Sequence, residues 1–143
     1  FIITEDLAGC ISLEDYFLSM PVEDRAGAKA EELISKLAES VKIMHQHGVN
    51  HRDLYICHFL FDPKKVESEQ TLHVIDLHRA QIRGKVPYRW LVKDVASVVY
   101  SMKEVCASKD QISTFTRLYN LGDDNQFWAA VMKKSDALLE KVI

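Results

Sequence analysis

The chain has 143 residues, enough for one domain with a core, and its 48% hydrophobic and 27% charged residues are ordinary for a globular protein. A formal net charge of −3 argues against a nucleic-acid-binding protein, whose surface would be strongly basic. The sequence has no apolar run long enough to cross a bilayer and no signal-peptide pattern, so we expect any contact with a membrane to be peripheral.

The chain begins with an apolar, β-branched run. Residues 1–4 have no cap or turn before them, and the polar residues 5–9 interrupt the run. A strand that starts at position 1 indicates a chain cut in the middle of a fold. A plain edge strand followed by a turn is the simplest interpretation of these residues taken alone.

Two helices are expected next. Ser12 is a typical N-cap, and the residues after it predict a short helix that ends near Met20. Pro21 restarts the chain, and a long helix is expected over residues 23–47, where Gly48 occupies the usual C-terminal position. Its apolar side chains recur at helical spacing and predict core: Leu33, Ile34, Leu37, Ala38, Val41 and Met44.

A short hairpin is expected after this helix. The apolar runs 59–61 and 72–75 predict two strands, with the polar residues 62–65 turning the chain between them. Asp53 lies on the loop that leads into the first strand, and Asp76 follows the second. The hairpin therefore predicts two acidic side chains presented on one side of the fold.

The remaining segments are a basic loop and three helices. Residues 78–89 are polar and basic, and residues 90–100 predict an apolar helix with one acid, Asp94, inside it. Residues 110–121 and 124–142 show amphipathic spacing and predict two further helices that supply core side chains.

The residues around the two acids resemble a kinase. His51-Arg52-Asp53-Leu54 is similar to the kinase H-R-D-L, and Asp76-Leu77-His78 stands in the place of D-F-G. The longer runs 48–59 and 74–80 resemble the lipopolysaccharide core kinases, and among them those that phosphorylate the first heptose of the inner core. The resemblance implies an α+β, mainly helical fold over residues 1–143: the C-terminal lobe of a protein-kinase-like fold with a short catalytic-loop hairpin.

The resemblance implies roles for the catalytic loop. Phosphoryl transfer depends on positioning and charge neutralisation, with a carboxylate that accepts or orients the attacking hydroxyl. Asp53 is the candidate for that base, although a surface loop Asp is the alternative. Arg52 is expected to order a loop through a carboxylate, and His51 to brace the loop by hydrogen bonds rather than act as an acid or base.

ATP and Mg²⁺ are the implied cofactors. Asp76 is expected to bind the magnesium ion, although a solvated Asp at a strand end is the alternative. His58 stands where protein kinases have an Asn as a magnesium ligand, and it is the candidate second metal ligand and cofactor-binding residue beside Asp76. Because magnesium prefers oxygen ligands, this departure puts a second metal site of the usual kind in doubt. A zinc site is disfavoured because His45 and His47 point in different directions on a helix and no paired cysteines accompany them.

An adenine site and a missing lobe follow from the same resemblance. The residues 1–9 would be the last strand of an N-terminal lobe and the hinge, where the Glu5 carbonyl and the Leu7 N–H meet adenine. The sequence contains no glycine-rich loop and no V-A-I-K lysine. The chain's own N-terminal lobe is therefore an implied partner, and the 143 residues alone are expected to bind ATP poorly and transfer little phosphate.

The basic segment and Asp94 complete the expected site. Arg79, Arg83, Lys85 and Arg89 could form a solvated loop, or they could hold an anionic acceptor such as inner-core lipopolysaccharide, because guanidinium groups suit carboxylates and phosphates. Asp94 matches a kinase Asp that accepts hydrogen bonds from the catalytic-loop backbone.

The expected function is ATP-dependent phosphorylation of a sugar hydroxyl of the lipopolysaccharide inner core. Two alternatives are open: a kinase of the same family that acts on the acidic core sugar, and a non-catalytic kinase-like binding module. Three widely separated cysteines give no disulfide framework. This pattern favours a reducing cytoplasm, and the resemblance implies a position at the cytoplasmic face of the bacterial inner membrane, as a peripheral protein.

Overall fold

The structure, a computed structural model, describes residues 7–105, 108–121 and 125–141. Glu5 and Cys106 lie outside this part of the chain. Within it, the α-helices are α1 (Leu13–Leu18), α2 (Ala28–Gln46), α3 (Tyr88–Glu104), α4 (Lys109–Tyr119) and α5 (Asn125–Glu140). Three short 3-10 turns cover Val22–Asp24, Ile56–His58 and Glu67–Glu69. The fold is mainly helical, as the sequence predicted.

The strands are short and form two small antiparallel sheets. One sheet has the order β1 (Ile11–Ser12), β3 (Phe59–Phe61) and β4 (His73–Val74), and the other pairs β2 (Val49–Asn50) with β5 (Gln81–Ile82). The predicted hairpin is β3 and β4, in which Phe59 faces Val74. The β2–β5 pair was not predicted, because two residues on each side leave no alternating pattern in the sequence.

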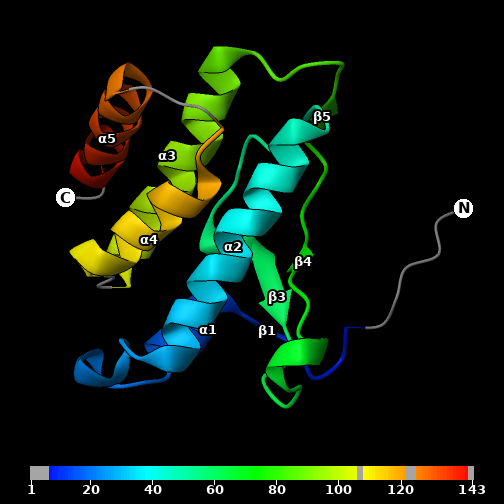
Figure 1. The fold of residues 1–143 in the computed structure, drawn as a ribbon, viewed down its shortest axis with the longest axis vertical. Coiled ribbons are helices and arrows are strands. Elements are labelled where there is room, and N and C mark those ends of the chain that lie inside the picture. Colours follow the sequence, from blue (N-terminus) through cyan, green and yellow to red (C-terminus); the bar gives the residue numbers. More distant parts are fainter. Residues whose placement is uncertain (1–6, 106–107, 122–124, 142–143) are drawn as a thin grey trace, which may run out of the picture.

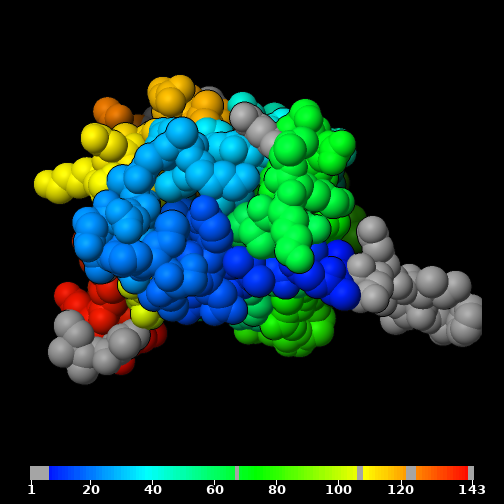
Figure 2. Space-filling model, turned by 90° about the horizontal axis from the view of Figure 1, so that it is seen from below, coloured from blue at the N-terminus to red at the C-terminus, as the bar shows by residue number. Residues whose placement is uncertain are grey.

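The helices pack in pairs. Figure 1 shows α2 through the middle of the molecule, with α4 against it, α5 against α3, and the β1–β3–β4 sheet beside its lower half. Seen from below, the dark blue segment at the start of the described chain crosses this face between two green patches (Figure 2), in keeping with the pairing of β1 with β3. The fully buried side chains at the centre come from α1, α2, α3 and α4 and include Leu13, Leu33, Leu37, Val41, Val98, Val99 and Phe115.

Local sequence explains where the helices begin and end. The Ser12 side chain caps α1 by accepting a hydrogen bond from Asp15 N at 3.0 Å, as predicted. The long helix begins at Ala28 instead of residue 23, so that prediction was wrong by five residues. Val22–Asp24 forms a 3-10 turn, and Gly27 takes a φ of 142°, a conformation that favours glycine and stops the helix there.

The other helices differ from their predictions mainly at the ends. The apolar helix expected over 90–100 extends over Tyr88–Glu104, since Pro87 supplies a helix-compatible N-cap and the apolar residues continue beyond position 100. Helix α4 starts in a capping box formed by Ser108 and Gln111. No helix among the described residues is long and apolar enough to cross a membrane.

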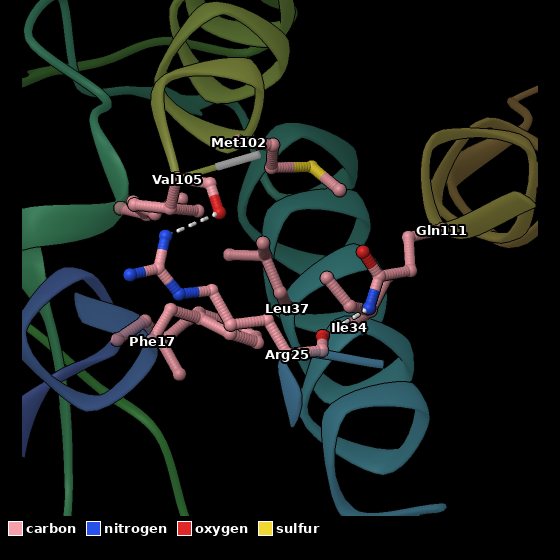
Figure 3. Close-up of a pocket in the computed structure, with 9 residues that line it drawn as sticks. Phe17, Arg25, Ile34, Leu37, Met102, Val105 and Gln111 are labelled. Atoms are coloured by element: carbon pink, nitrogen blue, oxygen red, sulfur yellow. Dashed lines mark hydrogen bonds between the residues drawn. The ribbon is translucent and has the colours of Figure 1, made fainter. Parts of the chain in front are cut away.

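A small apolar cavity lies between α1, α2, α3 and α4. It has a volume of about 10 Å³, room for one water molecule. Figure 3 shows Phe17, Leu37 and Met102 around it, while the Arg25 guanidinium donates to the Val105 carbonyl at 3.3 Å. Neither Asp53 nor Asp76 lines this cavity, which is part of the helical core.

Candidate active site

Gly48 fixes the start of the catalytic loop. Its φ of 81° favours glycine, and a Cβ atom there would lie 1.7 Å from the Arg83 carbonyl oxygen. Arg83 N donates to the Gly48 carbonyl at 2.8 Å. The close approach ties the segment after Asp76 to the end of α2, where the loop with Asp53 begins.

Asp94 on α3 holds the catalytic-loop backbone. Its Oδ2 accepts from His51 N at 2.8 Å, and its Oδ1 accepts from Arg52 N at 2.9 Å. His45 Nε2, on α2, lies 2.9 Å from Oδ2, and His45 Nδ1 lies 2.8 Å from the Tyr119 hydroxyl. The side chains of Asp94 and His45 are fully buried. Asp94 therefore ties the catalytic-loop backbone to α2 and α3.

His51 connects the two acid-bearing segments. Its Nδ1 accepts a hydrogen bond from Asp53 N at 3.1 Å, so its proton is on Nε2, which donates to the Ile75 carbonyl at 2.9 Å. The ring is buried. Both nitrogens are engaged by backbone groups, so the ring links the Asp53 loop to the end of β4.

Asp53 is partly exposed and paired with Arg79. The Arg79 Nη1 lies 2.9 Å from Oδ1 and 3.2 Å from Oδ2 of Asp53, and 22% of the Asp53 side chain is accessible. Of the predicted acceptor-binding residues, Arg79 is thus brought directly to the predicted base. The carboxylate faces solvent and an adjacent cation.

Asp76 faces two histidines. Its Oδ2 lies 3.2 Å from His58 Nε2, and its Oδ1 contacts His78 Nδ1. His58 Nδ1 donates to the Asp53 carbonyl at 2.8 Å, so this one ring spans the segments of both acids. Asp76 has a φ of 61°, a strained conformation that Asp tolerates better than most residues.

The donor set around Asp76 suits magnesium held jointly with a nucleotide. Among the described residues, no group of three His, Cys, Asp or Glu side chains forms a metal cage. Magnesium in nucleotide sites commonly takes one or two carboxylates and completes its shell with phosphate and water oxygens. The half-exposed Asp76 carboxylate meets that need, and His58 Nε2 lies 3.2 Å from its Oδ2.

The other predicted site residues lie apart from the acids. Arg83 contacts Gln81, and Lys85 lines a surface hollow with Gln46 and Leu121. Neither cation forms a hydrogen bond or ion pair with Asp53 or Asp76 in the part of the chain that the structure describes.

Of the two residues predicted to contact adenine, Glu5 and Leu7, the structure describes only Leu7. The Leu7 carbonyl accepts a hydrogen bond from Cys10 N at 3.0 Å, in a turn where Gly9 has a φ of 88°. The Glu5 carbonyl lies outside the described residues. The hinge role of both residues therefore stays a prediction.

Sequence reasoning missed two groups beside the site. Trp90, at the start of α3, lies under Arg52, Arg89 and Lys93. Burial lowers the Lys93 pKa, as do the neighbouring charges of Arg79 and Arg52. The sequence signal for this group was the spacing of two cations around Trp90: Arg89 directly before it and Lys93 three residues after it.

The geometry defines the class of the fold. A helix end, an acid-bearing loop anchored by a buried Asp, a hairpin and a second acid together make the C-terminal lobe of a kinase-like fold. A model of the lipopolysaccharide kinase (Kdo/WaaP) family matches residues 1–119. The chain belongs to this family.

Relatives agree with this assignment. Over 121 residues, the chain is 45% identical to the lipopolysaccharide core heptose(I) kinase WaaP of Escherichia coli strain K12, a match that covers 83% of the chain and 46% of the relative. It is 35% identical to the enzyme of the same name from Pseudomonas aeruginosa strain PAO1, over 99% of the chain and 56% of the relative. The chain spans about half the length of these relatives.

A solved structure matches the fold. The chain superposes with a TM-score of 0.79 on a structure described as WaaP in complex with acyl carrier protein, at 34% identity. The match covers 94% of this chain and 60% of that one. The mainly helical kinase-like lobe predicted from the sequence is thereby confirmed.

Proposed function

We propose that this chain carries the catalytic lobe of an ATP-dependent kinase that phosphorylates the first heptose of the lipopolysaccharide inner core. The observation that carries the proposal is the pair of acids, Asp53 and Asp76, joined through His58. Family membership and the names of the heptose(I) kinase relatives support the acceptor.

Asp53 is the proposed base. As the sugar oxygen forms a bond to the γ-phosphorus of ATP, the hydroxyl proton passes to the Asp53 carboxylate, and the bond to the bridging oxygen breaks to leave ADP. The Arg79 guanidinium lies 2.9 Å from Oδ1 of this carboxylate and pairs with it. His51 and Asp94 position the loop through its backbone.

Asp76, with His58 beside it, is the proposed magnesium-binding group. A magnesium ion bound there with ATP would neutralise charge on the phosphates. Because His58 Nδ1 donates to the Asp53 carbonyl, a neutral His58 ring turns the lone pair of Nε2 toward Asp76 Oδ2, 3.2 Å away, on the side where the metal ion would bind. The Glu5 carbonyl and Leu7 N–H are proposed to meet the adenine, and an N-terminal lobe is proposed to complete the nucleotide site.

Labelled ATP tests this proposal in the protein at its natural length, with inner-core lipopolysaccharide lacking heptose phosphate as acceptor. We expect label on heptose, and its loss in Asp53→Asn. Asp62→Asn, at the tip of the hairpin, is the matched control, because Asp62 Oδ1 only caps Lys64 N. Label on the acidic core sugar would favour the alternative kinase. Acceptor binding without any transfer would favour a binding module.

A peripheral position at the cytoplasmic face of the inner membrane belongs to the same proposal. The exposed apolar side chains Leu77, Ile82 and Tyr88 lie on the same segment as the four basic residues predicted to hold the acceptor. Basic and apolar side chains together favour an anionic lipid surface. Co-sedimentation with vesicles containing anionic lipid, compared with neutral vesicles, tests this position.

A carrier protein is a second proposed partner. The solved relative is described as a complex with acyl carrier protein, and we extend that association to this chain on the strength of the shared fold. Size-exclusion chromatography with purified acyl carrier protein tests it. Two separately eluting proteins at micromolar concentration would refute it.

A further inference from the structure

Three cations surround the Trp90 ring beside the catalytic loop. Arg52 Cζ lies 4.8 Å from the ring centroid, Arg89 Cζ lies 5.0 Å from it, and Lys93 Nζ lies 5.6 Å from it. All three distances are in the range of cation–π contacts. We call Trp90, Arg52, Arg89 and Lys93 the Trp90 cluster.

The cations of the Trp90 cluster form no ion pair with a carboxylate of the described residues, although Asp53 and Asp94 lie near enough to act on the Lys93 charge. In the described residues, no Asp or Glu lies within ion-pair distance of Arg52, Arg89 or Lys93. The nearby Asp53 carboxylate is paired with Arg79. The Asp94 carboxylate is buried and occupied by backbone N–H groups and by His45. Three cations therefore share a small volume without an acidic partner.

The positions of these cations on α3 oppose helix stability. Arg89 is the second residue of the helix, Lys93 follows four residues later, and the first turn contains no acid. Cations at a helix N-terminus oppose the helix dipole, and like charges four residues apart repel each other. Several residues that each destabilise a helix, with no contact that compensates for them, are typical of a functional site.

Unsatisfied polar atoms point to the same place. Arg52 Nε and the Trp90 indole Nε1 are buried and have no hydrogen-bond partner. No side chain caps the N-terminus of α3. A guanidinium that lies over an aromatic ring keeps its N–H edge free to bind oxyanions. The cluster therefore offers several donors and a positive potential to an oxygen-rich anion.

We propose that the Trp90 cluster binds an oxyanion, a phosphate or a carboxylate, that the acceptor carries near the hydroxyl served by Asp53. This inference rests on the proposed function and adds a subsite to it. Arg52 directly precedes Asp53, and Asp94 holds the Arg52 backbone, so the subsite has a fixed relation to the base. Three cations at a helix N-terminus suit a doubly charged phosphate better than a single carboxylate.

Binding is tested first without catalysis. The chain has two tryptophans, so its indole N–H groups give two NMR signals, which Trp128→Phe assigns. We expect the Trp90 signal to shift saturably with inorganic phosphate and more weakly with acetate. Lys93→Gln should weaken phosphate binding about tenfold, as expected for the loss of one hydrogen bond to a charged group.

Lys103→Gln is the matched control, because Lys103 is on the same helix and pairs with Asp136 at its far end. It should leave the phosphate titration unchanged. A Trp90 indole N–H signal that does not shift with phosphate or with acetate would overturn the proposal. So would an equal response in the parent and in Lys93→Gln.

Kinetics then identify which anion of the acceptor is bound. In the protein at its natural length, Lys93→Gln should raise the acceptor KM about tenfold and leave the ATP KM unchanged. If the cluster binds a phosphate, the increase in acceptor KM should vanish with an acceptor stripped of phosphate. If it binds a carboxylate, the increase should vanish with an acceptor whose carboxylates are reduced. An increase in the ATP KM alone would overturn the subsite while the kinase function stands. A protein that binds phosphate at the cluster but transfers none to any acceptor would contradict the proposed function instead.

Discussion

Removing the Asp94 carboxylate should destabilise the fold strongly, because three buried donors depend on it. Asp94→Ala leaves His51 N, Arg52 N and His45 Nε2 without an acceptor. Removing one member of a buried charged network costs about 3–5 kcal/mol. Asp94→Asn keeps the shape and one acceptor oxygen but turns an amide N–H₂ toward a donor, which costs about 1–3 kcal/mol.

Urea denaturation followed by circular dichroism measures this loss. With a slope of about 2 kcal/mol per M, Asp94→Ala should lower the midpoint by roughly 2 M at an unchanged slope. Asp136→Ala, which removes an exposed carboxylate 3.3 Å from Lys103, should cost under about 1 kcal/mol. Amide exchange at His51 and Arg52 should accelerate in Asp94→Asn. If Asp94→Ala unfolds within about 1 kcal/mol of the parent, this account of the loop is wrong.

Three further changes test other parts of the structure. Gly48→Ala should destabilise by about 3 kcal/mol or more in the same urea assay, because its φ of 81° and the facing carbonyl exclude a side chain. Lys93→Gln should raise the free energy of unfolding by about 0.2–0.5 kcal/mol, since it removes the repulsion with Arg89. The pKa of the Lys93 amine is lower in the folded protein than in the unfolded chain, so the folded protein binds this proton more weakly. The parent therefore gains stability as the pH rises. The difference in free energy of unfolding between the parent and Lys93→Gln should disappear as the pH approaches 10.5, the ordinary pKa of the amine. Burial and then Glu14 raise the pKa of the Cys57 thiol above 9.0, so alkylation of Cys57 should be slow at pH 8. Glu14→Gln should accelerate that alkylation, and an unchanged rate would contradict the assigned cause.

The sequence predicted what depends on local pattern and on motif. The N-cap at Ser12, the β3–β4 hairpin and the helical core follow from side-chain type and spacing, and the structure contains all three. The start of α2 was misplaced because a run of good helix formers hid the break at Gly27.

Features that depend on contacts between distant segments could not be read from the sequence. The β2–β5 pair joins residues more than thirty positions apart. The bond between His45 and Asp94, and that between Arg79 and Asp53, arise only once α2, α3 and the loop are packed together. The motif located both acids, but it gave no information about which cations would face them.

The two non-glycine residues with positive φ, among those that the structure describes, lie next to or at the predicted acids. Arg52 has a φ of 80° and Asp76 a φ of 61°, and such backbone costs about 1–3 kcal/mol at each position. Glycine at Asp76 would relieve this strain, because glycine adopts positive φ at little cost, but it would also remove the proposed magnesium-binding carboxylate. A relative with glycine at the position of Asp76 would therefore combine a less strained backbone with the loss of the proposed metal-binding group.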